Sequence, residues 1–323
     1  MRRIVLTVAA LLLAGLAAAA LLFVHGWSRP GPLGADATII VPEGATLRKA
    51  ADELEAQGAI GSATAFLARA RVLGPDGSIK AGEYRIPRRA SSADILGILQ
   101  SGKTLVHLVT IPEGMPSILV HERLMANDEL TGDIPVPEEG SVMPDSYGYQ
   151  KGETRAAVLG RMQAAMTSFI AAQWPKRSAA TPVKTPAQAV TLASIVEKET
   201  SIPAERPTVA GVYANRLREG MMLQADPTII YPITKGKPLG RRILQSEIRA
   251  VNDYNTYAMT GLPKGPIANP GRSSIEAVLR PAATKARYFV ADGKGGHIFA
   301  ETLAEHNANV RKWYDIRRQR GEM

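Results

Sequence analysis

The chain has 323 residues, of which 45% are hydrophobic and 21% charged, so it is not a collagen-like, coiled-coil or largely disordered protein. It contains no cysteine, which excludes disulfides, thiolate metal sites and cysteine nucleophiles. Its 39 basic and 30 acidic side chains give a formal charge of +9, which leaves nucleic acid, anionic lipid and acidic polymers as candidate partners. The five histidines show no metal-ligand spacing, and the length predicts two or three domains.

The N-terminus contains a long apolar run. In residues 4–24 only Thr7 and Gly15 are not strongly apolar, and as a helix the run is about 31 Å long, enough to cross a bilayer. The two arginines in residues 1–3 favour a cytoplasmic N-terminus, with the rest of the chain across the membrane. A cleaved signal peptide is the alternative, but its apolar core is usually only about 7–15 residues long. We therefore expect an uncleaved anchor and a body outside the cytoplasm, which argues against nucleic acid as a partner.

A small domain follows the anchor. Residues 25–36 are rich in Gly and Pro and predict a linker. Residues 37–103 then predict a strand, two helices, a second strand and a further helix, from alternating apolar residues and Thr or Ser helix caps. These elements are expected at residues 38–41, 46–57, 62–73, 80–86 and 91–102.

The next region, residues 104–184, opens on a short similarity to the small domain. Pro42-Glu43-Gly44 and Pro112-Glu113-Gly114 each follow a predicted strand and precede a predicted helix. This is either an internal structural repeat or a chance recurrence of a common turn sequence. A capped, amphipathic helix is predicted over residues 154–173.

The last region covers residues 185–323. Thr185-Pro186 is a helix cap followed by proline at the first helical position, and it starts a helix that runs to about Thr200. A second helix is expected over 203–219, and the stretch 231–272 is rich in loops. The remaining expected elements are a short helix from a capping box at Ser273-x-x-Glu276, a hairpin of strands 287–292 and 297–301, and a final helix from Thr302.

Two carboxyl groups, those of Glu197 and Glu199, stand at the end of an otherwise apolar helix. Because they are two residues apart, they lie about 200° apart around the helix axis and cannot face the same way. Glu197 falls on the apolar face, whereas Glu199 is expected to point outward or toward a loop. Burial disfavours the charged carboxylate, and a general acid must be neutral. The competing interpretation is a structural ion pair of Glu197 with Arg206 or Arg216.

A second polar cluster is suited to binding sugars. It comprises residues 254–257, with the sequence Tyr-Asn-Thr-Tyr, and the Gly/Pro-rich loop 265–271, which contains Asn269. Asn, Thr and Tyr side chains can hydrogen-bond sugar hydroxyl and acetamido groups, and tyrosine can stack on sugar faces. Gln224 and Asp226 add polar groups closer to the two glutamates. Ordinary caps, turns and a surface loop would explain the same residues.

Several short motifs occur in order between about residues 37 and 310. They are Pro112-Glu113-Gly114, Glu139-Gly140, Pro144-Asp145-Ser146-Tyr147, Ala193-Ser194-Ile195-Val196-Glu197-Lys198-Glu199-Thr200, Asn215-Arg216-Leu217, Leu223-Gln224-x-Asp226-Pro227-Thr228, Tyr254-Asn255-Thr256-Tyr257, Gly265-Pro266-Ile267-x-Asn269-Pro270-Gly271, Gly296-His297-x-Phe299 and Glu305-His306-Asn307. Together with the anchor, this series resembles the endolytic murein transglycosylase (MltG/YceG-like) family. It departs from the family pattern at Ser146, where threonine is expected, and at Lys264, where proline is usual.

The resemblance implies an α+β fold with three parts. These are the N-terminal transmembrane helix at 4–24, a small LysM-like β-α-α-β domain at 37–103 and a larger mixed α/β catalytic domain, made of a connecting region at 104–184 and a catalytic region at 185–323. It also implies a single-pass inner-membrane protein whose catalytic domain faces the periplasm. Its partners would be peptidoglycan glycan strands and peptidoglycan synthases, and no cofactor or metal is expected.

The resemblance implies a lytic transglycosylase, a lyase that cleaves the MurNAc–GlcNAc β-1,4 bond of nascent strands, leaves 1,6-anhydroMurNAc ends and terminates elongation. It maps the family's catalytic glutamate onto Glu197 as general acid, with Glu199 as a second candidate because the motif contains both. The MurNAc C6 hydroxyl would attack its own C1 while the Glu197 carboxylate takes its proton, so no protein nucleophile is required. The residues expected to bind the substrate are Gln224, Asp226, Tyr254, Asn255 and Asn269.

Two other functions fit parts of the sequence. A water-using muramidase needs a second carboxylate, about 6.5–9.5 Å away to activate water or about 5–5.5 Å away as a nucleophile, and Asp226 is the candidate. A non-catalytic wall-binding scaffold would explain the anchor and the small domain. It would give no reason for a glutamate on an apolar helix face.

Overall fold

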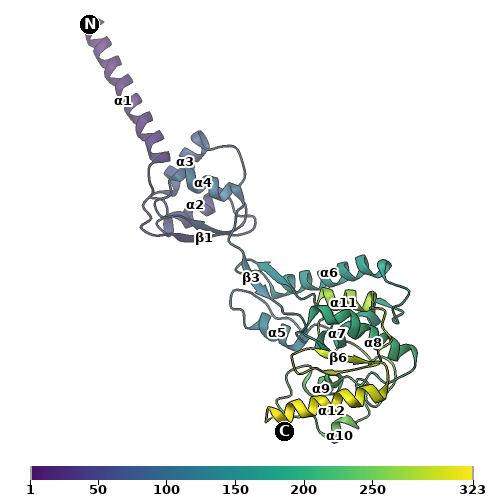
Figure 1. Cartoon of the computed structure of the whole chain (residues 1–323). Coiled ribbons are helices and arrows are strands. Elements are labelled where there is room, and N and C mark those ends of the chain that lie inside the picture. Colours follow the sequence, from purple (N-terminus) through teal and green to yellow (C-terminus); the bar gives the residue numbers. More distant parts are fainter. Residues whose placement is uncertain (1, 322–323) are drawn as a thin grey trace. The chain divides into compact units, whose positions relative to one another are not determined.

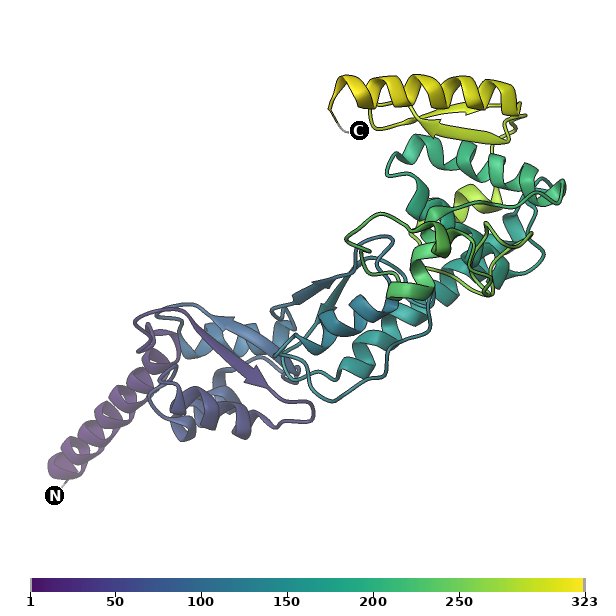
Figure 2. The same cartoon turned by 90° about the horizontal axis from the view of Figure 1, so that it is seen from below.

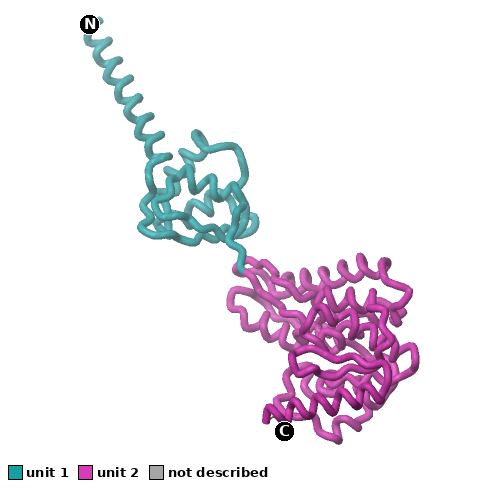
Figure 3. The backbone as a smooth tube through the Cα atoms, viewed as in Figure 1, with its two compact units in different colours: residues 1–107 teal, residues 108–323 magenta. Residues whose placement is uncertain are grey.

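The computed structural model describes residues 2–321 and divides into two compact units, Met1–His107 and Leu108–Met323 (Figure 3). Each unit has its own buried core. The division falls just after residue 103, where the small domain was expected to end.

The N-terminal apolar run forms one helix, α1 (Arg2–Ser28), which contains an 18-residue window with a mean hydropathy of 2.6 (Figure 1). Its length and composition suffice to cross a membrane, and its apolar stretch is not buried inside the protein. The helix continues into the predicted linker 25–36, and Trp27 packs on Phe66 with ring centroids 6.0 Å apart. The start of the linker is therefore helical, and Trp27 belongs to the core of the first unit.

The body of the first unit confirms the predicted order of elements. It comprises β1 (Ala37–Val41), α2 (Leu47–Ala56), α3 (Ala63–Leu73), β2 (Gly82–Ile86) and α4 (Ser92–Ser101). The two strands pair antiparallel, with Ile39 opposite Tyr84, and both side chains are fully buried. Thr46, Ser62 and Ser91 cap the three helices as predicted.

The second unit is mixed α and β. Its elements are β3 (His107–Thr110), α5 (Ser117–Met125), β4 (Ser146–Tyr149), α6 (Arg155–Gln173), α7 (Pro186–Glu199), α8 (Arg206–Arg218), α9 (Asp226–Thr234), α10 (Gln245–Ile248), α11 (Arg272–Leu279), β5 (Tyr288–Ala291), β6 (His297–Ala300) and α12 (Leu303–Gln319), with 3-10 turns at Trp174–Lys176 and Pro203–Glu205. Strands β3 and β4 pair with each other, and β5 and β6 form an antiparallel hairpin along which α12 lies (Figure 2).

Helix α7 lies at the centre of this unit. Thr185 caps it by accepting a hydrogen bond from the backbone N–H of Gln188, and Pro186 occupies the first turn, as predicted. Its side chains from Thr191 to Val196 are all buried, because α8 and α11 pack against it and against each other. A helix buried on all sides has no solvent-facing stripe, so its helical period says little about where its last residues point.

The stretch 231–272 is mostly loop, as predicted, and only the end of α9 and the short helix α10 interrupt it. The capping box predicted at Ser273 is wrong. Helix α11 begins after Gly271 and has no side-chain cap, since the Ser273 hydroxyl accepts a hydrogen bond from Arg206. The predicted helices at 154–173 and 185–200, the hairpin and the capping box at Thr302 are confirmed.

The two Pro-Glu-Gly segments form the same local turn. In each, a strand precedes the turn and a helix follows it, and the backbone N–H after the glycine donates to the proline carbonyl, at 3.1 Å from Ala45 and 3.2 Å from Met115. Gly44 and Gly114 both have φ of +72°, a conformation that favours glycine.

Candidate active site

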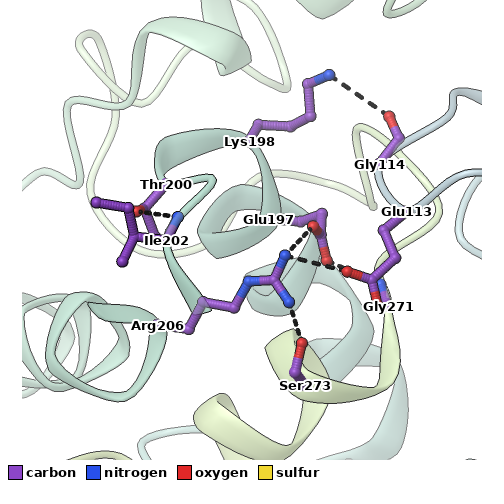
Figure 4. A network of polar contacts seen from close by, with 9 residues as sticks. All are labelled: Glu113, Gly114, Glu197, Lys198, Thr200, Ile202, Arg206, Gly271 and Ser273. Atoms are coloured by element: carbon purple, nitrogen blue, oxygen red, sulfur yellow. Dashed lines mark hydrogen bonds and ion pairs between the residues drawn. The ribbon is translucent and has the colours of Figure 1, made fainter. Parts of the chain in front are cut away.

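Three consecutive side chains at the end of α7 have three different surroundings, and Figure 4 shows the first two, Glu197 and Lys198. Glu197 faces Arg206, Lys198 reaches toward the Pro112–Gly114 turn, and Glu199 lies beside a separate pocket. Successive residues of a helix are rotated by about 100°, so one helix end can serve three surfaces.

Glu197 is held in a buried ion pair. Arg206 Nη2 donates to Glu197 Oε1 at 2.8 Å and the Gly271 backbone N–H donates to Oε2 at 2.9 Å (Figure 4). The same guanidinium nitrogen donates to Glu113 Oε2 at 3.1 Å, and Arg206 also donates to Ser273. The two paired side chains are only 4% and 8% exposed. The cluster thus joins α7, α8, the Pro-Glu-Gly turn and the start of α11.

These contacts correct one expectation about Glu197. Its carboxyl does not face apolar side chains, as the helix pattern predicted, but a guanidinium and a backbone N–H, as in the competing interpretation with Arg206. Arg216 is not the partner, because its guanidinium donates to the backbone carbonyls of Arg287 at 2.6 Å and Leu223 at 2.7 Å. The catalytic role assigned to Glu197 remains a prediction.

Glu199 has the raised pKa that a buried general acid requires. The residue is half-buried because part of it faces a pocket, but its Oε1 atom is fully buried and has no hydrogen-bond partner within residues 2–321. Burial raises the pKa of Glu199 to about 7, and the charge of Asp226 adds to this effect, while the Tyr213 hydroxyl and Arg216 oppose it. Glu199 therefore lies toward the loop of the β5–β6 hairpin, which is one of the two orientations expected for it.

A pocket of about 310 Å3 adjoins Glu199. It is formed by the end of α7, the β5–β6 hairpin and α12, and this volume is at the small end of the range for ligand pockets. The other residues that line it are Thr200, Ser201, Ala291, Gly293, Gly295, Gly296, His297, Trp313 and Arg320.

Asp226 and Gln224 lie at the start of α9. The exposed Asp226 carboxylate accepts a hydrogen bond from the Tyr257 hydroxyl at 2.6 Å, and its charge acts on Glu199. Gln224 has φ of +52°, and its backbone N–H donates to the Thr256 carbonyl at 3.1 Å, which leaves its side chain exposed. The structure therefore places Asp226 where its charge acts on Glu199, and it attaches the 254–257 segment to α9.

The two predicted asparagines are fully buried. The Asn255 amide donates to the carbonyls of Glu247, Ile248 and Ala250, the shortest at 2.7 Å. The Asn269 amide joins three segments, since it accepts from the Val142 N–H at 2.9 Å and donates to the Met115 carbonyl at 2.9 Å. This arrangement does not support direct sugar contact by either residue and points to a role in holding loops.

Tyr254 is half-buried and packs on Tyr231, with ring centroids 4.8 Å apart.

A second pocket, of about 500 Å3 and mostly apolar, lies where Lys198 reaches the Pro112–Gly114 turn. Among residues 2–321, no three His, Asp or Glu side chains come together as a metal site requires.

Sequence patterns alone do not predict that Tyr213, Glu205 and His297 lie near Glu199 or its pocket. Tyr213 is fully buried beside Glu199. Burial raises the pKa of the Tyr213 hydroxyl well above its usual range, and the charge of Glu199 raises it further. Glu205 and His297 pair at 2.8 Å next to the pocket. His297 lies in one of the motifs noted above, so its position was visible, but its distant partner was not.

The model of the YceG-like family matches residues 39–312 of this chain. The chain belongs to the YceG-like family. The two glutamates and the ion-pair cluster lie inside the matched range, as does most of the hairpin pocket, whose Trp313 and Arg320 follow it.

Two curated relatives are similar to this YceG-like chain. An endolytic murein transglycosylase of Bacillus subtilis is 33% identical over 196 residues, which cover 61% of this chain and 53% of that protein. One of Streptococcus pneumoniae serotype 2 is 28% identical over 322 residues, which cover 84% of this chain and 57% of that protein. The chain thus spans about half the length of the curated relatives it matches.

A solved structure agrees with the fold. A putative YceG-like protein from Listeria monocytogenes superimposes with a TM-score of 0.52 and 26% sequence identity, over 84% of this chain and 98% of that chain. The mixed α and β architecture described above is therefore the YceG-like fold.

Proposed function

We propose that this protein is an endolytic peptidoglycan lytic transglycosylase, which cleaves the MurNAc–GlcNAc β-1,4 bond within glycan strands and leaves 1,6-anhydroMurNAc ends. Support comes from the family and from the names of both curated relatives. The chemistry requires a carboxyl that is still neutral near pH 7, because this group must donate a proton to the leaving oxygen.

The observation that carries the proposal is the state of Glu199. It is the carboxyl at the end of α7 with a buried, unpaired oxygen, a pKa raised to about 7 and an adjoining pocket. We therefore assign the general acid to Glu199, although the sequence favoured Glu197. Glu197 would instead fix the end of α7 through Arg206 and Gly271.

The reaction needs few other groups. Glu199 donates its proton to the glycosidic oxygen and the C1–O4 bond breaks. The MurNAc C6 hydroxyl attacks C1 of the same sugar and gives up its proton to a base. Because the nucleophile belongs to the substrate, its effective molarity is high and no protein nucleophile is needed. Trp313 in the pocket offers an aromatic face on which a sugar ring can stack.

The finer statements on location belong to the same proposal. Helix α1 would anchor the protein in the inner membrane with its catalytic unit in the periplasm, since two arginines precede the apolar run. The β1-α2-α3-β2 arrangement would be a LysM-like module that binds glycan strands. Peptidoglycan synthases would be partners, because the product ends nascent strands.

The test is a digestion of purified glycan strands by the full-length protein in detergent, with products analysed by mass spectrometry. Anhydro ends support the proposal, whereas products that have gained water indicate a muramidase with Asp226 as second carboxylate. Unchanged strand length indicates a binding scaffold. Glu199→Gln should lower the rate by about 10²–10⁴-fold, the usual contribution of general acid catalysis.

The matched variant is Glu197→Gln, at the neighbouring carboxyl. It should keep measurable cleavage, because it removes only a charge from the Arg206 cluster. The opposite result, an active Glu199→Gln and an inactive but folded Glu197→Gln, would return the acid role to Glu197.

A further inference from the structure

One group in the Glu199 pocket has no role in the reaction described so far. His297, the first residue of β6, lines this pocket together with Glu199. Its ring packs edge-on against Phe289, with centroids 5.1 Å apart and planes at 85°, and its side chain is 16% exposed. The imidazole is therefore held in a fixed orientation at the pocket.

The Glu205 carboxyl contacts both the ring and the backbone of His297. Its Oε2 lies 2.8 Å from His297 Nδ1, and its Oε1 accepts from the His297 backbone N–H at 2.9 Å. The same carboxyl accepts from the Thr200 hydroxyl at 3.0 Å, one residue beyond Glu199. Glu205 thus ties the end of α7, which carries Glu199, to the hairpin that forms the pocket's other side.

These contacts determine which ring nitrogen carries a hydrogen. Burial alone would raise the pKa of Glu205, but the hydrogen bonds from His297 and Thr200 outweigh it and hold the pKa below its usual range. The carboxylate is thus an acceptor, so Nδ1–H is the donor. In the neutral ring Nε2 then carries the lone pair, and it is the nitrogen that Glu205 does not hold.

The close approach of Glu205 also explains a glycine. A Cβ on Gly296 would lie 2.7 Å from Glu205 Oε1, closer than side-chain carbons come to oxygen. Gly296 therefore allows the carboxylate to reach the backbone N–H of His297. A carboxylate that orients an imidazole in this way is the arrangement by which histidine serves as a general base.

We propose that His297 is a second catalytic residue, the base that takes the proton of the MurNAc C6 hydroxyl, oriented by Glu205 as a positioning residue. This rests on the proposed function. As the C1–O4 bond breaks, its electron pair stays on O4, which receives the Glu199 proton. The C6 oxygen forms the C1–O6 bond and its proton passes to Nε2. Return of that proton to the Glu199 carboxylate through water restores both groups, so no co-reactant is consumed.

The experiment measures release of anhydro ends by the full-length protein in detergent. His297→Gln keeps a side-chain N–H that can donate to Glu205 but has no basic nitrogen, so it should fold and lose about 10²–10⁴-fold in rate. His297→Ala should be equally slow and regain activity in proportion to added imidazole. Glu199→Gln should gain nothing from imidazole, because it lacks the acid.

The matched control is His121→Gln, at another half-buried histidine of the second unit that does not line the pocket. It should cleave at the wild-type rate. A folded His297→Gln within twofold of the wild type overturns the proposal, as does a His297→Ala that folds but is not rescued. A wild-type protein that releases no anhydro ends removes the proposed function as well, so the two failures are distinguishable.

Discussion

Glu197 and Glu199 stand two residues apart in the last turn of α7, and their carboxyls have opposite surroundings. Glu197 is paired with Arg206 at 2.8 Å, whereas a buried oxygen of Glu199 has no hydrogen-bond partner in the described part of the chain. One helix end thus provides a structural carboxylate and a carboxyl poised to hold a proton. This division leads to predictions that can be measured separately.

The rate of cleavage should depend on pH through Glu199. Because its pKa is raised to about 7, the acid is protonated below this pH and loses its proton above it. kcat/KM should therefore fall about tenfold for each pH unit well above 7. Replacing Asp226 with Asn removes a charge that raises this pKa, so the alkaline limb should move to lower pH.

A pH-rate profile of the wild type and Asp226→Asn provides the measurement. The exposed Asp253, which pairs with Lys264, offers a matched control carboxylate, and Asp253→Asn should leave the alkaline limb in place. An alkaline limb that stays unchanged in Asp226→Asn would contradict the electrostatic link between Asp226 and Glu199.

The free energy of unfolding should also depend on pH through Glu199. Between pH 4.5, the ordinary pKa of a glutamate, and about 7, the folded protein binds a proton at Glu199 that the unfolded chain has lost. The stability provided by this site is therefore complete below pH 4.5 and is lost as pH rises toward 7. Glu199→Gln should match the wild type at low pH and exceed it by about 3 kcal/mol above pH 7.

Urea unfolding at pH 4.5, 6 and 8 measures this difference. Glu205→Gln is the contrasting variant, because the pKa of Glu205 is lowered and its charged form is the stabilising one. A Glu199→Gln protein that is no more stable than the wild type at pH 8 would show that the buried carboxyl has found compensation.

The Arg206 cluster should stabilise the fold strongly. Arg206→Met would leave the buried Glu197 carboxylate without its guanidinium, and removal of one partner from a buried pair costs about 3–5 kcal/mol. The double variant Arg206→Met/Glu197→Gln should recover part of this loss because no charge is left behind. The exposed pair Glu219–Arg287 is the control, and Glu219→Gln should cost at most about 1 kcal/mol. Equal costs for the two pairs would contradict this account.

Asn255 should matter for stability before it matters for turnover. Asn255→Ala removes the buried amide that donates to the carbonyls of residues 247–250, and each lost hydrogen bond costs about 0.5–1.5 kcal/mol. Thermal unfolding of this variant should show a lower Tm. KM at a temperature where it remains folded should be that of the wild type. A raised KM with an unchanged Tm would support the direct sugar contact that the sequence suggested.

The sequence predicted well what local chemistry determines. Thr185-Pro186 placed the start of α7, and Thr302-x-x-Glu305 placed the start of α12, because caps act over three or four residues. The strands of the first unit were predicted from alternating apolar residues, which is also a local pattern. These elements include those that build the pocket.

The prediction at the two glutamates failed because their surroundings are not local. Helical phase relates Glu197 and Glu199 to α7 alone, but Arg206 comes from the next helix and the pocket beside Glu199 comes from the hairpin and α12, about a hundred residues later. A pattern of apolar neighbours cannot show which carboxyl meets a guanidinium. Only the packing of distant segments settles that question.

The way α1 ends has a mechanical consequence. Trp27 packs beside Phe66, and the Arg69 side chain donates to the Phe23 carbonyl at 3.1 Å, so the end of the apolar helix is packed against the rest of the first unit. With α1 in a bilayer, these contacts would hold the first unit at a constant height above the lipid surface, whereas a flexible linker would let that height vary. The layer of wall polymer within its reach would then be set by geometry, and inserting glycines after Trp27 would change that layer.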